Sequence, residues 1–153
     1  MVDYDILMPE SDYNKALDTL SATLGDIYAE SWVKDKQETY GKTFNMNLAT
    51  FAQLWFNSAL KIFVATENGN TVGFMVGMVF RPLPYDASVF QIEDWYSPRQ
   101  DVVKGLFDYA QNAIRFIGCD EVWIADRADR EPMINSSAWK ENNRFLFRRY
   151  VRA

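Results

Sequence analysis

Two adjacent carboxylates, Glu93 and Asp94, have the types and the setting that could support proton-transfer chemistry. They lie in segment 88–96, where apolar and polar residues alternate as in a β-strand, and two aromatic residues, Trp95 and Tyr96, follow directly. A carboxyl group beside aromatic rings is desolvated, which raises its pKa and suits it to act as a general base. The structural alternative is that one of these acids pairs with an arginine from a neighbouring strand.

The residue types that the chain lacks narrow the chemistry further. It contains no histidine and a single cysteine, Cys119. This excludes Ser-His-Asp and Cys-His nucleophile systems, and it removes the commonest zinc ligand. We predict no metal site, because the acids of segment 126–131 alternate with arginines and are typical of a solvated, salt-bridged loop. Proton transfer must therefore use Asp, Glu, Lys, Tyr or water.

Composition is that of an ordinary globular protein. The 153 residues are 48% hydrophobic and 24% charged, which predicts one domain spanning 1–153. The net charge of −5 argues against general nucleic-acid binding, which depends on Lys and Arg neutralising phosphates. The first residues are acidic rather than basic, and no stretch approaches the roughly 20 apolar residues of a membrane span. We therefore expect a cytoplasmic protein without a membrane partner.

Hydrophobic periodicity and turn residues predict a mixed α/β (α+β) fold. A strand that is apolar on both faces, 71–80, should lie centrally, and its connection to the preceding strand through Asn68-Gly69 is a strong hairpin signal. The strand–helix–strand unit from 88 to 125 predicts a parallel crossover. The expected strands are 5–8, 62–66, 71–80, 88–96, 121–125 and 144–151, and the expected helices are about 12–32, 47–59, 101–117 and a short one at 136–142.

This order of elements, and three stretches within it, resemble the GNAT superfamily of acyl-CoA-dependent N-acetyltransferases. KIFVATENGNTVGFMVG is similar to that family's second and third strands, and RPLPYDASVFQIEDWYSP to its following loop and fourth strand. DVVKGLFDYAQNAIRFIGCDEVWI is similar to its third helix and fifth strand. The long second helix and the PLPY loop are particularly similar to GNAT proteins carried by bacteriophages. The resemblance implies a mostly antiparallel central sheet with helices on both faces.

The resemblance also implies a cofactor and site residues. The cofactor would be acetyl-CoA, with Glu93 or Asp94 as the base and an amine of a small molecule or protein as the acceptor. The residues expected to bind the coenzyme are Trp95, Tyr96, Arg99, Gln100, Lys104 and Gly105. The family's Gln/Arg-x-x-Gly-x-Gly/Ala pyrophosphate loop is degenerate in this chain. Its place is taken by a shorter segment, 99–105, which has no glycine pair and carries Asp101.

Two functions therefore stay open at this stage. One is an acetyl-CoA-dependent N-acetyltransferase, whose catalysis the altered loop puts in question. The other is a GNAT-fold protein that binds no cofactor and serves as a binding or structural module, for instance in a bacteriophage virion or a host interaction. The second would act through a protein partner or self-association, and fold alone does not decide between the two.

Overall fold

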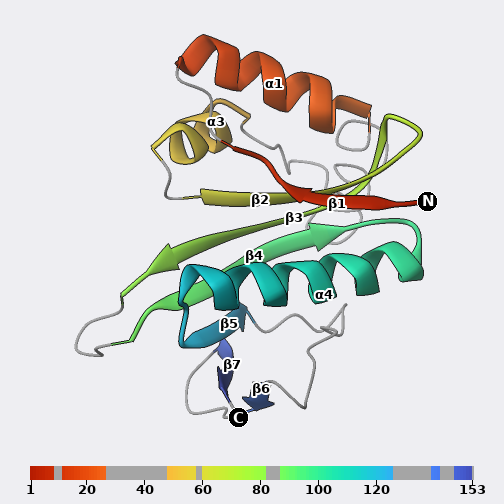
Figure 1. Ribbon diagram of the computed structural model, residues 1–153. Helices are drawn as coiled ribbons and strands as arrows, with labels where there is room; N and C mark the ends of the chain where they lie inside the picture. Colours follow the sequence, from red (N-terminus) through yellow and green to blue (C-terminus); the bar gives the residue numbers. More distant parts are fainter. Residues whose placement is uncertain are drawn as a thin grey trace, which may run out of the picture.

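Figure 1 shows the computed structural model, which describes residues 1–8, 12–26, 48–57, 60–81, 87–125, 139–141 and 147–152. The strands are β1 (Asp3–Ile6), β2 (Leu60–Glu67), β3 (Asn70–Phe80), β4 (Val89–Tyr96), β5 (Glu121–Ala125), β6 (Trp139–Glu141) and β7 (Phe147–Arg152). The helices are α1 (Tyr13–Asp26), α3 (Leu48–Phe56) and α4 (Gln100–Ile117).

The strands form one seven-stranded sheet in the order β1-β2-β3-β4-β5-β7-β6. Every neighbouring pair is antiparallel except β4 and β5, which are parallel and connected through α4. Helices α1 and α3 pack on one face of the sheet over β2 and β3, and α4 packs on the other face (Figure 1). The predicted mostly antiparallel sheet with helices on both faces is therefore confirmed.

The hairpin between β2 and β3 has the geometry that its sequence predicts. Asn68 and Gly69 both have positive φ, 53° and 80°, as a type I′ turn requires. Strand β3 is buried on both faces: Met75 contributes to the core beneath α4, and Phe74 and Val76 contribute to the core beneath α1 and α3. The hairpin thus supplies the two central strands on which both helical layers rest.

Helix α4 is the layer that borders the candidate site. It ends at Gly118, which adopts a left-handed conformation with φ 97° and satisfies the last carbonyl groups of the helix. The helix lies close to β3 because Gly73 has no side chain: a Cβ there would be 2.7 Å from Cγ1 of Val102 and 3.1 Å from Cδ1 of Leu106. Gly73 therefore fixes how closely the first turns of α4 approach the sheet.

Two capping and anchoring contacts hold the opposite layer. Asp12 caps α1, since its Oδ1 accepts hydrogen bonds from the N–H groups of Asn14 and Lys15 at 2.9 and 3.2 Å. The indole N–H of Trp55 in α3 donates to the carbonyl of Leu7, which follows edge strand β1, at 3.2 Å. The predicted edge strand, first two helices and first strands are thus present, with bounds shifted by a few residues.

One predicted element is wrong. The helix expected over 136–142 is contradicted, because Trp139–Glu141 form strand β6, which pairs antiparallel with β7 from Trp139↔Arg152 to Glu141↔Tyr150. The backbone hydrogen bonds of an adjacent strand override a weak local helix pattern. Predictions for 27–47, 82–86 and 126–138 lie outside the described residues.

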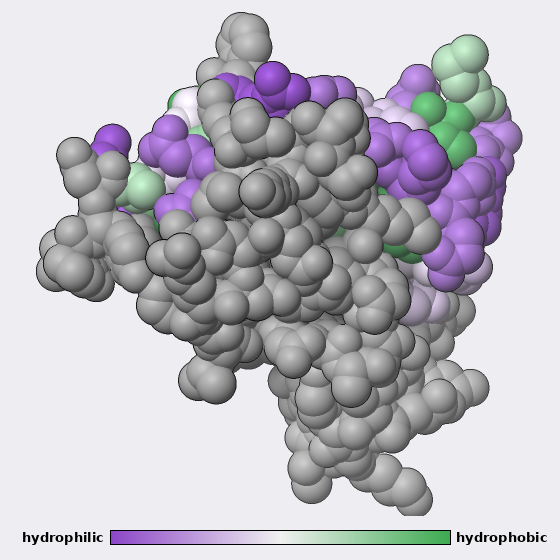
Figure 2. Space-filling view, turned by 90° about the horizontal axis from the view of Figure 1, so that it is seen from below, coloured by the Kyte–Doolittle hydropathy of each residue, from purple (hydrophilic) through white to green (hydrophobic). Residues whose placement is uncertain are grey.

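The surface and hydropathy of the described residues add two observations. No described helix is long and apolar enough to cross a membrane. On the face in Figure 2, the described residues are mostly hydrophilic, and hydrophobic ones form only small groups. The described part of that face therefore carries no extended apolar patch of the kind that marks protein interfaces.

Candidate active site

A β-bulge in β4 places Glu93. The β3–β4 ladder pairs Val76 with Asp94, but the next residue, Gly77, pairs with Ile92. Glu93 is therefore the extra residue of β4, with no register partner on β3. Gly77 accommodates the irregularity, because a Cβ there would overlap the ring of Phe90 and lie 2.7 Å from the carbonyl oxygen of Gln91. Bulges of this kind redirect a side chain, and here the redirected side chain is the candidate base.

The bulge also changes which residues share a face of β4. Strict alternation predicts that Asp94 shares a face with both Ile92 and Tyr96. In the structure Ile92 lies in the core beneath α4, whereas Asp94 lies opposite Val76 on the α1/α3 face, as does Tyr96. The prediction that Asp94 and Ile92 lie on the same face of β4 is wrong, because the inserted residue shifts the alternation by one position.

The Glu93 side chain turns back along its own strand. Its Oε1 accepts a hydrogen bond from Nε2 of Gln91 at 2.7 Å. Partial burial raises the pKa of the Glu93 carboxyl, and the neighbouring charge of Asp94 acts in the same direction, while the Gln91 hydrogen bond opposes both. The residue as a whole stays exposed, so Glu93 remains accessible while its carboxyl holds a proton more readily than an ordinary glutamate.

Asp94, Trp95 and Tyr96 are built into the fold. Asp94 is buried, and its Oδ1 accepts the N–H of Trp95 at 2.8 Å. The Trp95 ring packs edge-on against Phe107 of α4, with centroids 5.1 Å apart. The Tyr96 ring lies on the other face, near Phe74. Of the two predicted base candidates, the structure brings only Glu93 to an exposed position.

The β4–β5 ladder ends at the bulge. It runs from Val89↔Glu121 to Ile92↔Ile124, while the β3–β4 ladder continues as far as Tyr96. Glu93 therefore lies where β4 passes the end of its pairing with β5. No group of three potential metal ligands is found among the described residues.

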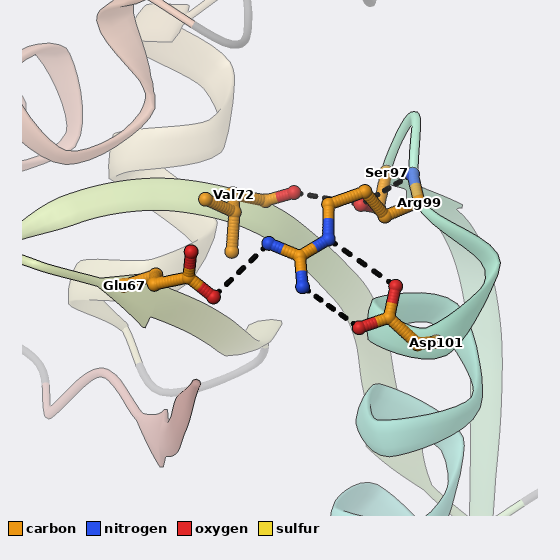
Figure 3. Close-up of polar contacts among 5 residues, drawn as sticks. All are labelled: Glu67, Val72, Ser97, Arg99 and Asp101. Atoms are coloured by element: carbon orange, nitrogen blue, oxygen red, sulfur yellow. Dashed lines mark hydrogen bonds and ion pairs between the residues drawn. The ribbon is translucent and has the colours of Figure 1, made fainter. Parts of the chain in front are cut away.

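An ion-pair network occupies the other predicted half of the site, at the start of α4 (Figure 3). Arg99 precedes the helix, and its guanidinium contacts two carboxylates. Nε and Nη2 donate to Oδ1 and Oδ2 of Asp101 at 3.2 and 2.8 Å, and Nη1 donates to Oε2 of Glu67 at 3.0 Å. We call Glu67, Arg99 and Asp101 the Arg99 network. It connects the end of β2 to the first turn of α4.

The backbone N–H directly before α4 is also hydrogen-bonded. The Arg99 N–H donates to Oγ of Ser97 at 3.2 Å, and that hydroxyl donates to the carbonyl of Val72 at 2.7 Å (Figure 3). The Arg99 hydrogen bond holds the pKa of Asp101 below its usual range, and the N–H groups of Val102 and Asp101 itself act in the same direction. The carboxylate of Asp101 thus lies where a helix N-terminus would bind an external anion.

The remaining predicted cofactor residues are dispersed. Gln100 is exposed in the first turn of α4. Lys104 forms an ion pair with Asp108, one turn along the helix, at 2.8 Å, which raises the Lys104 pKa. Gly105 faces β1 instead, since a Cβ there would overlap the hydroxyl and ring of Tyr4. Glu67 was missed by sequence reasoning, because nothing local signals a partner 32 residues away from Arg99.

Comparisons with solved structures identify the architecture. The chain is similar to a predicted acetyltransferase from Clostridium acetobutylicum solved with acetyl-CoA (TM-score 0.63, 14% identity, 95% of this chain and 94% of that chain). It is also similar to an aminoglycoside acetyltransferase from an uncultured soil metagenomic sample in complex with sisomicin (TM-score 0.60, 14% identity, 84% and 79%). A third is a ribosomal-protein-alanine N-acetyltransferase from Brucella melitensis (TM-score 0.54, 15% identity, 81% and 80%).

No family model and no curated protein matches the sequence. At identities of 14–15% the likeness to solved structures establishes the fold, which is the GNAT fold that the sequence predicted. The GNAT fold implies coenzyme A as the acyl carrier. Its pyrophosphate does not fit the start of α4, because the carboxylate of Asp101 already lies there and the Arg99 cation is shared between two acids.

Proposed function

We propose that this protein transfers an acyl group from a thioester to an amine, with Glu93 as the general base. The observation that carries the proposal is the bulge at Glu93, located where the β4–β5 ladder ends. A bulge that exposes one carboxylate at the end of a strand ladder is typical of a built site rather than of a structural ion pair. The alternative of an arginine partner finds no support at Glu93, whose hydrogen-bond partner within the described residues is Gln91.

The chemistry that Glu93 supports is proton removal from the attacking amine. An amine in water near neutral pH is mostly protonated, and it must lose a proton before its nitrogen can attack the thioester carbonyl. The Glu93 carboxylate accepts that proton directly or through one water. Nitrogen then bonds to the carbonyl carbon, the carbon–sulfur bond breaks, and the thiolate takes the second proton that the nitrogen loses. The products are an amide and a free thiol.

The raised pKa of Glu93 suits this role. A base works best when its pKa lies near the operating pH, and the pKa of an ordinary glutamate lies well below neutrality. Burial and the Asp94 charge move the pKa of Glu93 upward, toward that range. Two neighbouring negative charges also favour a cationic acceptor. The similar aminoglycoside acetyltransferase, solved with sisomicin, supports an amine acceptor by analogy of fold.

A second candidate is favoured by the Arg99 network. In this alternative the fold is a non-catalytic binding or structural module, for instance of a bacteriophage virion or a host interaction. Arg99 and Asp101 then replace the coenzyme contacts as an internal connection between β2 and α4. Such a module would act through a protein partner or through self-association, and neither Glu93 nor a thioester would matter to it.

Acyl transfer distinguishes the two candidates. The purified protein is mixed with an acetyl thioester and either an aminoglycoside or a peptide α-amine, and thiol release is followed across the pH range. We expect release that depends on the amine and rises with pH through the pKa of Glu93. In Glu93→Gln this rise of the rate with pH should disappear, and transfer should be slower by about 10²–10⁴-fold.

Asp18→Asn is the matched control, because it removes one exposed carboxylate from α1, on an element that does not carry the candidate base. It should leave the rate and the pH profile unchanged. No amine-dependent release from any acetyl thioester, or equal rates in wild type and Glu93→Gln, would contradict the proposed function and favour the second candidate.

A further inference from the structure

The start of α4 directly follows the strand that carries the candidate base. Segment 97–99 connects Tyr96, the last residue of β4, to Gln100, the first residue of α4. A helix N-terminus attracts anions, because its first N–H groups point out of the helix and its dipole is positive there. A donor carrying phosphates would therefore find this position attractive if it were open.

Asp101 takes that position instead. Its carboxylate lies in the first turn and accepts two hydrogen bonds from Arg99. The N–H of Arg99 is used by Ser97. An arriving phosphate would have to displace a carboxylate that a guanidinium holds through two hydrogen bonds.

Charge opposes the phosphate as well. Arg99 is shared by Glu67 and Asp101, and Lys104 is paired with Asp108. These three carboxylates against two cations leave the set of residues that joins the end of β2 to α4 net negative. A pyrophosphate carries further negative charge into the same space, so like charges repel it.

We infer that Asp101 excludes a pyrophosphate from the start of α4 and is therefore the specificity-determining residue for the thioester donor. This inference rests on the proposed function, because it names the class of thioester that the Glu93 site takes. It implies that the nucleotide half of acetyl-CoA adds nothing to binding. The relevant donors are then thioesters that carry no pyrophosphate or that hold it away from α4.

Binding measurements on the intact chain test the inference. S-Acetylpantetheine and acetyl-CoA share the acyl arm and differ in the phosphate-bearing nucleotide, and calorimetry gives the Kd of each. For the wild type we expect the two values to agree within about threefold, which is less than one charge-assisted hydrogen bond would give. For Asp101→Asn we expect acetyl-CoA to bind at least about tenfold more tightly, with S-acetylpantetheine unchanged.

Two further variants make the result specific. Asp108→Asn removes the same charge from the same helix one turn further on, beside Lys104, and should leave the ratio of the two Kd values near that of the wild type. Asp101→Ser removes the same carboxylate by a different substitution, and serine is well tolerated in a first helical turn. Circular dichroism checks that each variant retains its helices.

Each outcome decides something different. Wild type that binds acetyl-CoA more than about threefold more tightly than S-acetylpantetheine overturns the inference and leaves the proposed function standing. The same holds if Asp101→Asn and Asp101→Ser gain no affinity for acetyl-CoA, or gain no more than Asp108→Asn does. If S-acetylpantetheine and acetyl-CoA both fail to bind the wild type, the proposed function falls, and the inference falls with it.

Discussion

The guanidinium of Arg99 and the carboxylate of Asp101 face each other at the start of α4, joined by two hydrogen bonds of 3.2 and 2.8 Å. This paired geometry holds an internal anion at the helix N-terminus, where the GNAT fold implies an external one. Glu67 contacts the same guanidinium from the end of β2, so the pair is also a connection between hairpin and helix.

The Arg99–Asp101 pair predicts a loss of folding stability at low pH that requires both residues. Arg99 lowers the pKa of Asp101, so the stability from this pair is present above the unfolded pKa of about 3.9 and is lost as pH falls through the lower folded pKa. Arg99→Gln and Asp101→Asn should each lack this loss on acidification, and combining them should remove no further part of it. Melting temperatures measured from neutral pH into acid check this, and three curves parallel to that of the wild type would contradict it. The effect is small, because the pair is exposed to solvent.

Glu93→Gln should stabilise the fold at neutral pH. The Glu93 pKa is raised in the folded state, so the folded protein holds this proton to a higher pH than the unfolded chain does. Stability therefore falls as pH rises from the unfolded pKa of about 4.3 through the folded pKa, and glutamine avoids this loss. Urea unfolding should show a free-energy gain for the variant at pH 7 that disappears near pH 4. An equal gain at both pH values would show that ionisation of Glu93 is not its cause.

Gly73→Ala should destabilise the contact between α4 and β3. The new methyl group would lie 2.7 Å from Cγ1 of Val102 and 3.1 Å from Cβ of Ser97, and overpacking of this kind costs about 1–3 kcal/mol. Val102→Ala removes the closest atom, so the cost of Gly73→Ala should shrink in that background. Denaturant unfolding of the two single variants and the double variant measures this coupling. Strict additivity would place the strain elsewhere.

Gly105→Ala distinguishes a packing role from a cofactor role. Alone it should destabilise the protein, because the overlap with Tyr4 outweighs the roughly 1 kcal/mol that alanine gains over glycine in a helix. In a Tyr4→Ala background the same change should be stabilising, since only the helix propensity remains. Its Kd for S-acetylpantetheine should equal that of the wild type. A loss of thioester affinity without a loss of stability would instead place Gly105 at the donor.

Local sequence patterns were sufficient wherever local physics decides the structure. Asn68-Gly69 predicted the hairpin because both residues tolerate positive φ, and the apolar stripe followed by Gly118 predicted α4 and its end. Glu93 was identified as an acid in the fourth strand, and the structure places it in β4, hydrogen-bonded to Gln91.

Features that depend on neighbouring strands could not be predicted in this way. The alternation of β4 does not reveal the inserted residue at Glu93, because a bulge depends on register with β3 and on Gly77. Strand β6 forms through pairing with β7, against its local helix pattern. The partner that Arg99 finds in Glu67 is brought to it only by the fold.

The location of the donor tests the central claim most directly. Backbone amide resonances of the ¹⁵N-labelled protein are followed during titration with S-acetylpantetheine and, separately, with acetyl-CoA. We predict that both thioesters perturb the amides around Glu93, and that acetyl-CoA adds no perturbation at Gln100, Asp101 or Val102. Perturbation of these three amides by acetyl-CoA in the wild type, or none around Glu93 with either thioester, would contradict the claim.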